Sequence, residues 1–250
     1  MRALLKAGLF CTILFCFSFS GAFAQDIKLP EPDFKKPVLK ALKNQRSVRS
    51  FDSKEVPLQL LAEVLWAGFG INRPETGGRT APSGGGSREI DIYVVLKKGT
   101  YKYNPQEHSL DLVTNEDLRP IMFTQDYAES IPVNLAYVSN LNRLTTKLPI
   151  EYTMMHSGLV AQNVNIYCVS VGLGSVIRSP RDSGKLAEAL NLREDQKVIA
   201  WHALGYPGTG GSEQAGKKGA KSGKKAAKKG TKRPKGKGGG GGIPPLVSPR

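Results

Sequence analysis

Two arginines and a serine within four residues form the first group in this sequence that could bind a ligand. They are Arg46, Ser47 and Arg49, inside the stretch Gln45–Phe51. A guanidinium group stays charged at any relevant pH, and its fork of N–H donors matches the oxygens of a phosphate. The spacing therefore indicates a phosphate site. Taken alone, the cluster also fits a solvated surface turn.

Predicted helices and a loop surround this cluster. Residues 34–44 are expected to form a short helix before it, and Pro57 is expected to begin a second one, with apolar residues recurring along one face as far as Phe69. Residues 72–87 are rich in Gly, Pro, Thr and Ser, which predicts a loop. The cluster should thus lie in a connection between two helices.

The rest of the chain alternates predicted strands and helices. The predicted strands are residues 90–96, 101–103, 110–113, 133–139, 175–178 and 197–205, and the predicted helices are 115–130, 150–171 and 183–190. This order predicts an α/β or α+β domain around one sheet. The helix over 150–171 has apolar residues on nearly every side, so we expect it to be buried in the core or in a subunit interface.

A series of short motifs follows the cluster in a specific order. Together they cover about residues 40–208 and closely resemble the nitroreductase family of flavin enzymes, most strongly its branch that contains the azoline dehydrogenases of thiazole/oxazole peptide synthesis. The motifs are Gln45–Phe51, Arg79–Gly86, Ile90–Val95, Tyr101–Pro105, Ala161–Asn163, Gly172–Ser175 and Leu204–Pro207.

This resemblance implies a mixed sheet flanked by helices, non-covalently bound FMN, and a homodimer whose interface makes both active sites. The family's phosphate-binding and ribityl-binding role would fall on Arg46, Ser47 and Arg49. The remaining cofactor contacts would come from the loop Pro82, Ser83 and Gly84 of the partner subunit, and from the backbone of Gly174 and Ser175 near the reactive edge of the ring.

The activity implied by the resemblance is an FMN-dependent oxidoreductase. It would transfer a hydride between a donor such as NAD(P)H and an unidentified organic substrate, or oxidise a substrate in the manner of an azoline dehydrogenase. No catalytic side chain is predicted, because the flavin itself carries the hydride. Tyr152 and Arg178 could face the substrate.

The other reactive side chains are expected to be structural. His108, His156 and His202 have no spacing typical of metal ligands, so we predict no metal site and expect each histidine to be structural or solvated. Cys168 lies within the apolar helix and is expected to be a buried apolar group, which leaves no disulfide in the chain after residue 24.

Two departures from the family pattern leave an alternative function open. Gln45 stands where many members carry a second arginine, and Gly208–Gly211 stands where many carry a basic residue that closes on the phosphate, so that only Lys217 or Lys218 could reach back. FMN affinity is therefore expected to be modest. The alternative is a catalytically silent dimeric relative that binds an anionic polymer through a basic tail.

The first 24 residues have the pattern of a secretory signal. Arg2 and Lys6 precede an apolar run over residues 7–19, and Ala22–Ala24 has the small-residue cleavage pattern. An uncleaved anchor is the alternative, although the run is shorter than the roughly 20 residues that span a membrane. We expect an exported, periplasmic protein without a membrane span after cleavage. Because nicotinamide donors are cytoplasmic, such a protein would need another electron source.

The net charge of +15 is concentrated at the C-terminal end. Residues 217–250 hold twelve of the 36 Lys and Arg residues and no acid, so that residues 25–216 carry a net charge of only +1. We expect one domain over residues 25–212 and a disordered Lys/Gly-rich tail over 213–250. This tail either binds a polyanion through its charge or is a solvated extension.

Overall fold

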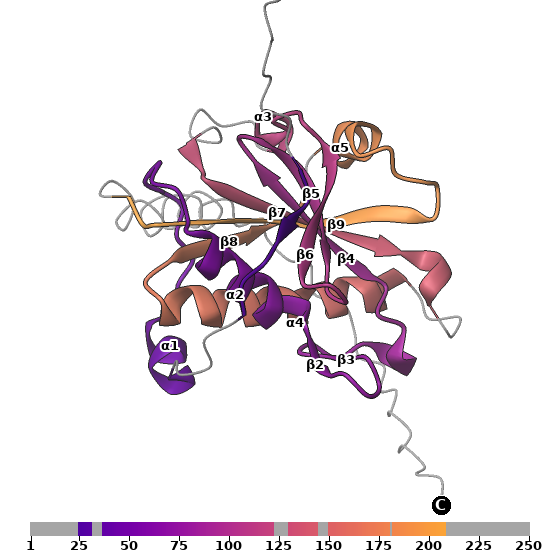
Figure 1. Cartoon of the computed structure of the whole chain (residues 1–250), viewed down its shortest axis with the longest axis horizontal. Coiled ribbons are helices and arrows are strands. Elements are labelled where there is room, and N and C mark those ends of the chain that lie inside the picture. Colours follow the sequence, from indigo (N-terminus) through magenta and orange to yellow (C-terminus); the bar gives the residue numbers. More distant parts are fainter. Residues whose placement is uncertain (1–24, 32–36, 123–129, 145–149, 181, 209–250) are drawn as a thin grey trace, which may run out of the picture. The chain divides into compact units, whose positions relative to one another are not determined.

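The computed structural model describes residues 25–31, 37–122, 130–144, 150–180 and 182–208. The predicted signal (1–24) and the whole of the predicted tail (213–250) lie outside these residues. The described chain forms an α+β domain, as expected, in which one large sheet separates two groups of helices (Figure 1).

The sheet has seven strands in the order β1-β6-β5-β4-β7-β9-β8, and every neighbouring pair is antiparallel. The predicted mixed sheet is therefore wrong for the described residues. Strands β4, β5 and β6 are joined by tight turns, which require antiparallel neighbours. The only parallel pairing among the described residues is an isolated bridge between Ser47 and Ser175. The strands are β1 (Ile27–Lys28), β4 (Ile90–Leu96), β5 (Gly99–Asn104), β6 (Ser109–Thr114), β7 (Val133–Asn140), β8 (Gly174–Arg178) and β9 (Gln196–Gly205).

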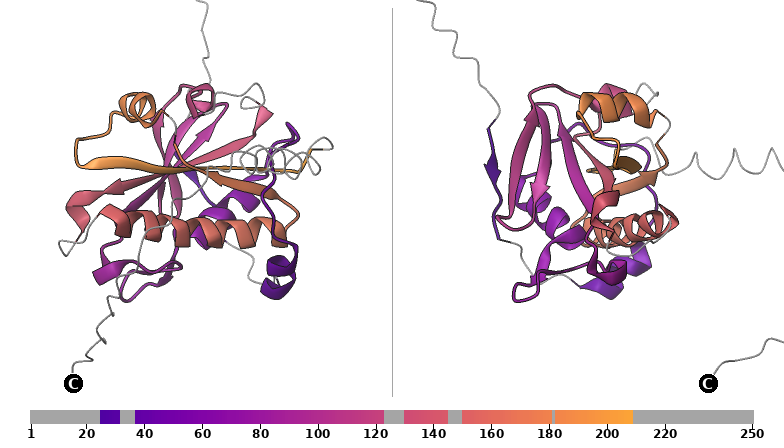
Figure 2. Two further views of the ribbon diagram at one scale, coloured as in Figure 1. Left: turned by 180° about the vertical axis from the view of Figure 1, so that it is seen from behind. Right: turned by 90° about the vertical axis from the view of Figure 1, so that its right-hand side faces the viewer.

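Helices cover both faces of the sheet (Figure 2). One group consists of α1 (Val38–Asn44), α2 (Leu58–Phe69) and α4 (Ile150–Ser170), and the other of α3 (Arg119–Met122) and α5 (Ser183–Ala189). Strand β4 shows why two cores form. Ile92 and Val94 belong to the core with α2 and α4, whereas Tyr93 and Val95 belong to the core with α3 and α5, because successive side chains of a strand point to opposite faces.

Most predicted elements are confirmed, and two differ in extent. The predicted helix over 115–130 is reduced to α3 among its described residues, since 123–129 lie outside them. The predicted loop over 72–87 contains the end of β2 (Ile71–Arg73), all of β3 (Gly78–Arg79) and the 3-10 turn η1 (Gly84–Gly86). Strands of two or three residues are too short to show an alternating pattern, so the sequence did not predict them.

Helix α4 is only half buried. Thr153, His156, Val160, Val164 and Cys168 face the core, whereas Met154 is 57% and Met155 53% exposed. The helix ends in a glycine cap. Gly172 has φ +80°, its N–H donates to Val169 O, and the N–H of Leu173 donates to Cys168 O at 2.8 Å. This cap turns the chain directly into β8.

Candidate functional site

The predicted phosphate-binding segment is held in place by its backbone. The N–H of Val48 donates to Ser175 O at 3.0 Å, which fixes the segment along β8. On its other side, the N–H of Asp52 donates to Tyr206 O and the N–H of Gly208 donates to Ser50 O, each at 2.9 Å. Residues 47–52 thus run between β8 and the segment that follows β9, although more than a hundred residues of sequence separate them from either piece.

The two arginine side chains of this segment are exposed. Neither Arg46 nor Arg49 has an ion pair or side-chain hydrogen bond to another described residue, and Ser47 is exposed beside them. We refer to Arg46, Ser47 and Arg49 as the cationic cradle. A fixed backbone with two unpaired guanidinium groups is the arrangement that a phosphate requires.

The structure places Gly174 and Ser175 beside this cradle, while their predicted contact with a flavin stays a prediction. Ser47 forms the parallel bridge with Ser175. A Cβ atom on Gly174 would lie 2.7 Å from the side chain of Val48, closer than real Cβ atoms approach a neighbour. Glycine is therefore required for the segment to pack this closely against the start of β8.

A buried polar network lies directly behind Ser175. Its hydroxyl donates to Asn165 Oδ1 at 2.7 Å, and the same oxygen lies 3.0 Å from His202 Nε2. Because Oδ1 only accepts, Nε2 carries the hydrogen, so Nδ1 accepts from the hydroxyl of Tyr137 at 2.8 Å. Burial lowers the pKa of His202 to about 3 and raises that of Tyr137, so both side chains are neutral.

Sequence reasoning missed this network as a unit. Its members lie on β7, α4, β8 and β9, and no local pattern links residues at positions 137, 165, 175 and 202. His202 itself was expected to be structural or solvated, and the structure shows the structural role. Cys168 is also buried as expected, and burial raises the pKa of its thiol to about 12.

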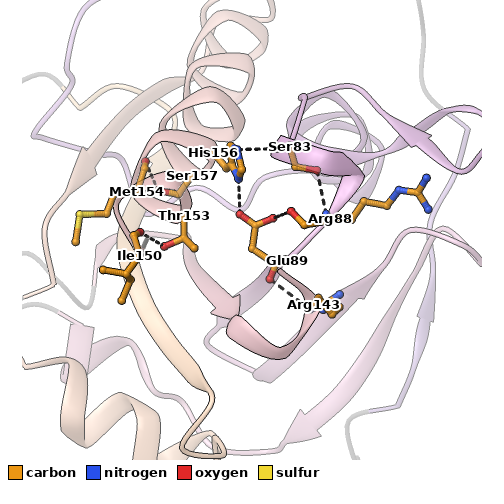
Figure 3. Close-up of polar contacts among 11 residues, drawn as sticks. Ser83, Arg88, Glu89, Arg143, Ile150, Thr153, Met154, His156 and Ser157 are labelled. Atoms are coloured by element: carbon orange, nitrogen blue, oxygen red, sulfur yellow. Dashed lines mark hydrogen bonds and ion pairs between the residues drawn. The ribbon is translucent and has the colours of Figure 1, made fainter. Parts of the chain in front are cut away.

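The second predicted group, Pro82, Ser83 and Gly84, lies elsewhere. The N–H of Gly84 donates to His156 Nε2 at 2.9 Å, and the hydroxyl of Ser83 accepts from the N–H of Arg88 (Figure 3). His156 and Asn165 are nine residues apart on α4, or roughly 13 Å along its axis. Within a single chain, the loop therefore does not reach the cradle.

Glu89 holds the loop through His156. The carboxylate is fully buried and lies 2.5 Å from His156 Nδ1, and the hydroxyl of Ser87 donates to its other oxygen at 2.6 Å (Figure 3). Since Nε2 accepts from Gly84, Nδ1 carries the hydrogen and donates to Glu89. His156 is thus structural, as expected, whereas the sequence did not identify Glu89.

Three other side chains that the sequence analysis named, His108, Tyr152 and Arg178, lie away from the cradle residues in the sequence. His108 lies 3.1 Å from the hydroxyl of Tyr103 and 3.1 Å from Pro30 O, so it too is structural. Tyr152 is partly exposed on α4, and Arg178 ends β8. The ring of Tyr152 lies edge-on to that of His156, with 6.2 Å between the ring centroids, so Tyr152 contacts the side chain that holds the Gly84 loop.

The sequence profile described as the nitroreductase family matches residues 42–206. The chain belongs to the nitroreductase family. The match begins before the cationic cradle and ends after β9, so it contains both groups of predicted cofactor contacts. Proteins of this family generally bind flavin.

Individual relatives agree with this assignment. The chain is 31% identical over 163 residues to MJ1384 of Methanocaldococcus jannaschii, which carries the name nitroreductase; the match covers 60% of this chain and 82% of the relative. A crystal structure of a protein described as a nitroreductase from Ralstonia eutropha JMP134 is 38% identical, with a TM-score of 0.71, over 76% of this chain and 92% of the other.

A more distant structure shares the fold alone. The Escherichia coli microcin synthetase McbBCD complex, with truncated pro-MccB17 bound, contains a chain that is 15% identical, with a TM-score of 0.57. The match covers 82% of this chain and 84% of that one.

Among the residues that the structure describes, no three His, Cys, Asp or Glu side chains gather as ligands for a metal ion. No helix in the same part of the chain is both long enough and apolar enough to span a membrane.

Proposed function

We propose that this protein is an FMN-dependent oxidoreductase that transfers a hydride between a donor such as NAD(P)H and a small organic substrate. The observation that carries the proposal is the cationic cradle, whose backbone is fixed on both sides while both guanidinium groups are unpaired among the described residues. A charged group without a partner is what an anionic cofactor would neutralise.

The residues present fit FMN. Arg46 and Arg49 would hold the phosphate, with Ser47 donating a hydroxyl hydrogen bond. The backbone at Gly174 and Ser175 would lie along the ring, where the absence of a Cβ on Gly174 permits close approach. FMN would supply a ring nitrogen that accepts and returns a hydride. The protein would bind the cofactor, orient it and keep the buried side of the site free of water.

A homodimer would complete this site. The loop at Pro82–Gly84 lies far along α4 from the cradle of the same chain, so in our proposal it contacts the flavin of a partner subunit. The exposed apolar side chains of α1 and α4 support such an interface, since their burial would be favourable. They are Val38, Leu39, Leu42, Ile150, Tyr152, Met154, Met155 and Leu159.

The substrate class follows from a finer resemblance. The motif order is most similar to that of the azoline dehydrogenases, and the fold is shared with a chain of the McbBCD complex. The motif order favours oxidation of a heterocycle as one form of the reaction, and the McbBCD chain adds only the shared fold. Our proposed location is the periplasm. NAD(P)H would then act as donor to the purified protein, and another reductant would donate the hydride in that compartment.

The alternative is a catalytically silent relative that binds an anionic polymer. Gln45 in place of an arginine favours this alternative, because it leaves the cradle with one cation fewer than in many family members. In that case the basic residues at 217–250 would provide the binding, with the strong salt dependence typical of polyanion contacts.

The test is to purify the full chain, record its visible absorbance and identify the cofactor released by heat. The variant Arg46→Ala/Arg49→Ala should lose bound FMN and dye-linked turnover together. Arg193→Ala is the matched control, because the Arg193 guanidinium pairs with Asp195, directly before β9, and with no other carboxylate of the described residues. A wild-type protein that stays colourless after FMN is added would count against the enzyme and favour the alternative.

A further inference from the structure

A second cationic site lies over strands of the sheet that are distant from β8 and the cradle. It is a cavity of about 220 Å³ over β4, β5 and β6. Strand β8, beside which the cradle lies, is three strands away from β4, or roughly 14 Å. The cavity is lined by four cations, Arg79, Arg88, Lys102 and Arg143, by the carboxylates Asp91 and Asp111, and by the aromatic rings of Phe69 and Tyr103.

Arg79 is the unusual member of this group. Its side chain is only 9% exposed, yet Nε and Nη1 are buried without a hydrogen-bond partner. The contact that the structure gives its guanidinium is the face of Phe69, at 5.5 Å from the ring centroid. Burial lowers the pKa of Arg79, and the charges of Arg88 and Arg143 act in the same direction. A buried guanidinium without an acceptor is costly, so an anionic partner is expected.

The carboxylates of the cavity do not meet this need. Asp91 is already shared between Lys102, at 3.1 Å, and Arg143, at 2.5 Å. Asp111 accepts hydrogen bonds from Asn104 and Ser109. Among the described residues, no carboxylate forms an ion pair with Arg79. The lining side chains therefore carry a net charge of +2, which a dianion would balance.

We propose that this cavity is a binding site for a small dianion that presents a phosphate or a pair of carboxylates to Arg79. Guanidinium forks bind both groups through paired hydrogen bonds. The cavity is smaller than the roughly 300–1,000 Å³ of pockets that hold drug-sized ligands, so its ligand must be small. No residue of the cradle lines the cavity, so the dianion and the phosphate of FMN would bind at separate sites.

Two of the cavity cations also hold the Gly84 loop and its support. The backbone N–H of Arg88 donates to Ser83 Oγ at 2.9 Å, and the side chain of Arg143 donates to Glu89 O (Figure 3). An anion that binds Arg88 and Arg143 therefore stabilises the same residues that position Gly84. Occupancy of the cavity should slow hydrogen exchange in this loop.

Calorimetric titration of the full chain with sodium phosphate tests the site, at an ionic strength held constant with sodium chloride. The titration is repeated with malonate, because binding of phosphate alone indicates a phosphate ligand whereas binding of both dianions indicates a site that also accepts dicarboxylates. The background is Arg46→Ala/Arg49→Ala, so that the cradle itself cannot bind the probe. In this background we expect saturable binding of the dianion. Adding Arg79→Gln should weaken its affinity at least tenfold, whereas adding Arg193→Gln should leave the affinity unchanged.

Thermal unfolding separates a binding role of Arg79 from a structural one. Ligand binding to the native state raises its stability by an amount that grows with ligand concentration. Phosphate should therefore raise the melting temperature of the Arg46→Ala/Arg49→Ala background. The increase should be much smaller when Arg79→Gln is added. Lys102→Gln, at a partly exposed position, provides a milder variant with affinity reduced a few-fold. Equal phosphate affinity with and without Arg79 would overturn the proposal, as would no saturable binding of either dianion.

Discussion

Ser175 and Asn165 are joined by a buried hydrogen bond of 2.7 Å, which connects the cradle to the core of the protein. The carbonyl of Ser175 accepts the N–H of Val48, while its hydroxyl donates to Asn165 on α4. Asn165 also accepts from His202. One amide oxygen on the long helix thus positions the strand beside which the cationic cradle lies.

Replacing Asn165 by Ala should therefore affect both stability and cofactor affinity. Ser175 and His202 would each lose a buried acceptor, at a cost of about 1–3 kcal/mol for each unsatisfied group. Urea unfolding measures the first effect and fluorescence titration with FMN the second. Asn163→Ala is the control on the same helix, since the side chain of Asn163 donates to Thr80 O and takes no part in the network of Ser175 and His202. Equal FMN affinity in the two variants would show that the network does not position the cradle.

His202 should make the protein less stable in mild acid. Its pKa is about 3 in the folded protein and about 6.5 when unfolded, so between these values the unfolded state binds more protons. Stability from this group is complete above pH 6.5 and falls by about 1.4 kcal/mol per pH unit below it. From pH 7 to pH 5 the loss is about 2 kcal/mol. Glutamine does not titrate, so the free energy of unfolding of His202→Gln, measured in urea, should fall by about 2 kcal/mol less than that of the wild type between pH 7 and pH 5. An identical pH dependence in both proteins would contradict this.

The elements of the fold could be predicted well because their signals are local. Pro57 before an apolar face predicts α2, and alternation over 90–96 predicts β4. The direction of strand pairing could not be obtained in this way, and the resemblance supplied a mixed sheet where the described sheet is antiparallel. Pairing depends on which distant strands meet, and β7 lies between β4 and β9 through contacts that span up to about seventy residues.

The candidate site was predictable only where residues are adjacent in sequence. The cluster at Arg46–Arg49 was visible as a run of cations, and the structure places Gly174 and Ser175 beside it. Arg79 gave no sign of its environment, because its burial depends on the packing of Phe69 and Arg143 from separate elements. Glu89 similarly looked like an ordinary acid before a strand, although it is fully buried.

Gly174→Ala should disturb the cradle without a change of charge. The new methyl group would lie 2.7 Å from Val48, so either β8 or the segment that holds Arg46 and Arg49 must move. Overpacking of this kind costs typically 1–3 kcal/mol, and FMN affinity should fall at least tenfold. Fluorescence titration and urea unfolding measure both effects. Gly184→Ala in α5 is the control, since the nearest atom to a Cβ at this position would be Asp182 Oδ1, at 3.9 Å. If Gly174→Ala retains the wild-type FMN affinity, the packing of β8 against Val48 has no role in cofactor binding.

The exposed methionines of α4 should determine the oligomeric state. Met154 and Met155 lie on the helix side that faces away from the core. Met155→Glu would place a charge in an apolar interface, where an unpaired charge is costly. We expect a homodimer in sedimentation velocity for the wild type, a monomer for Met155→Glu, and loss of FMN from that monomer because it lacks the partner's Gly84 loop. Val113→Glu on β6 introduces the same charge at another exposed apolar position and should leave the dimer intact. If the Met155→Glu monomer retains FMN with full affinity, the cradle of one chain suffices and the loop has no role in cofactor binding.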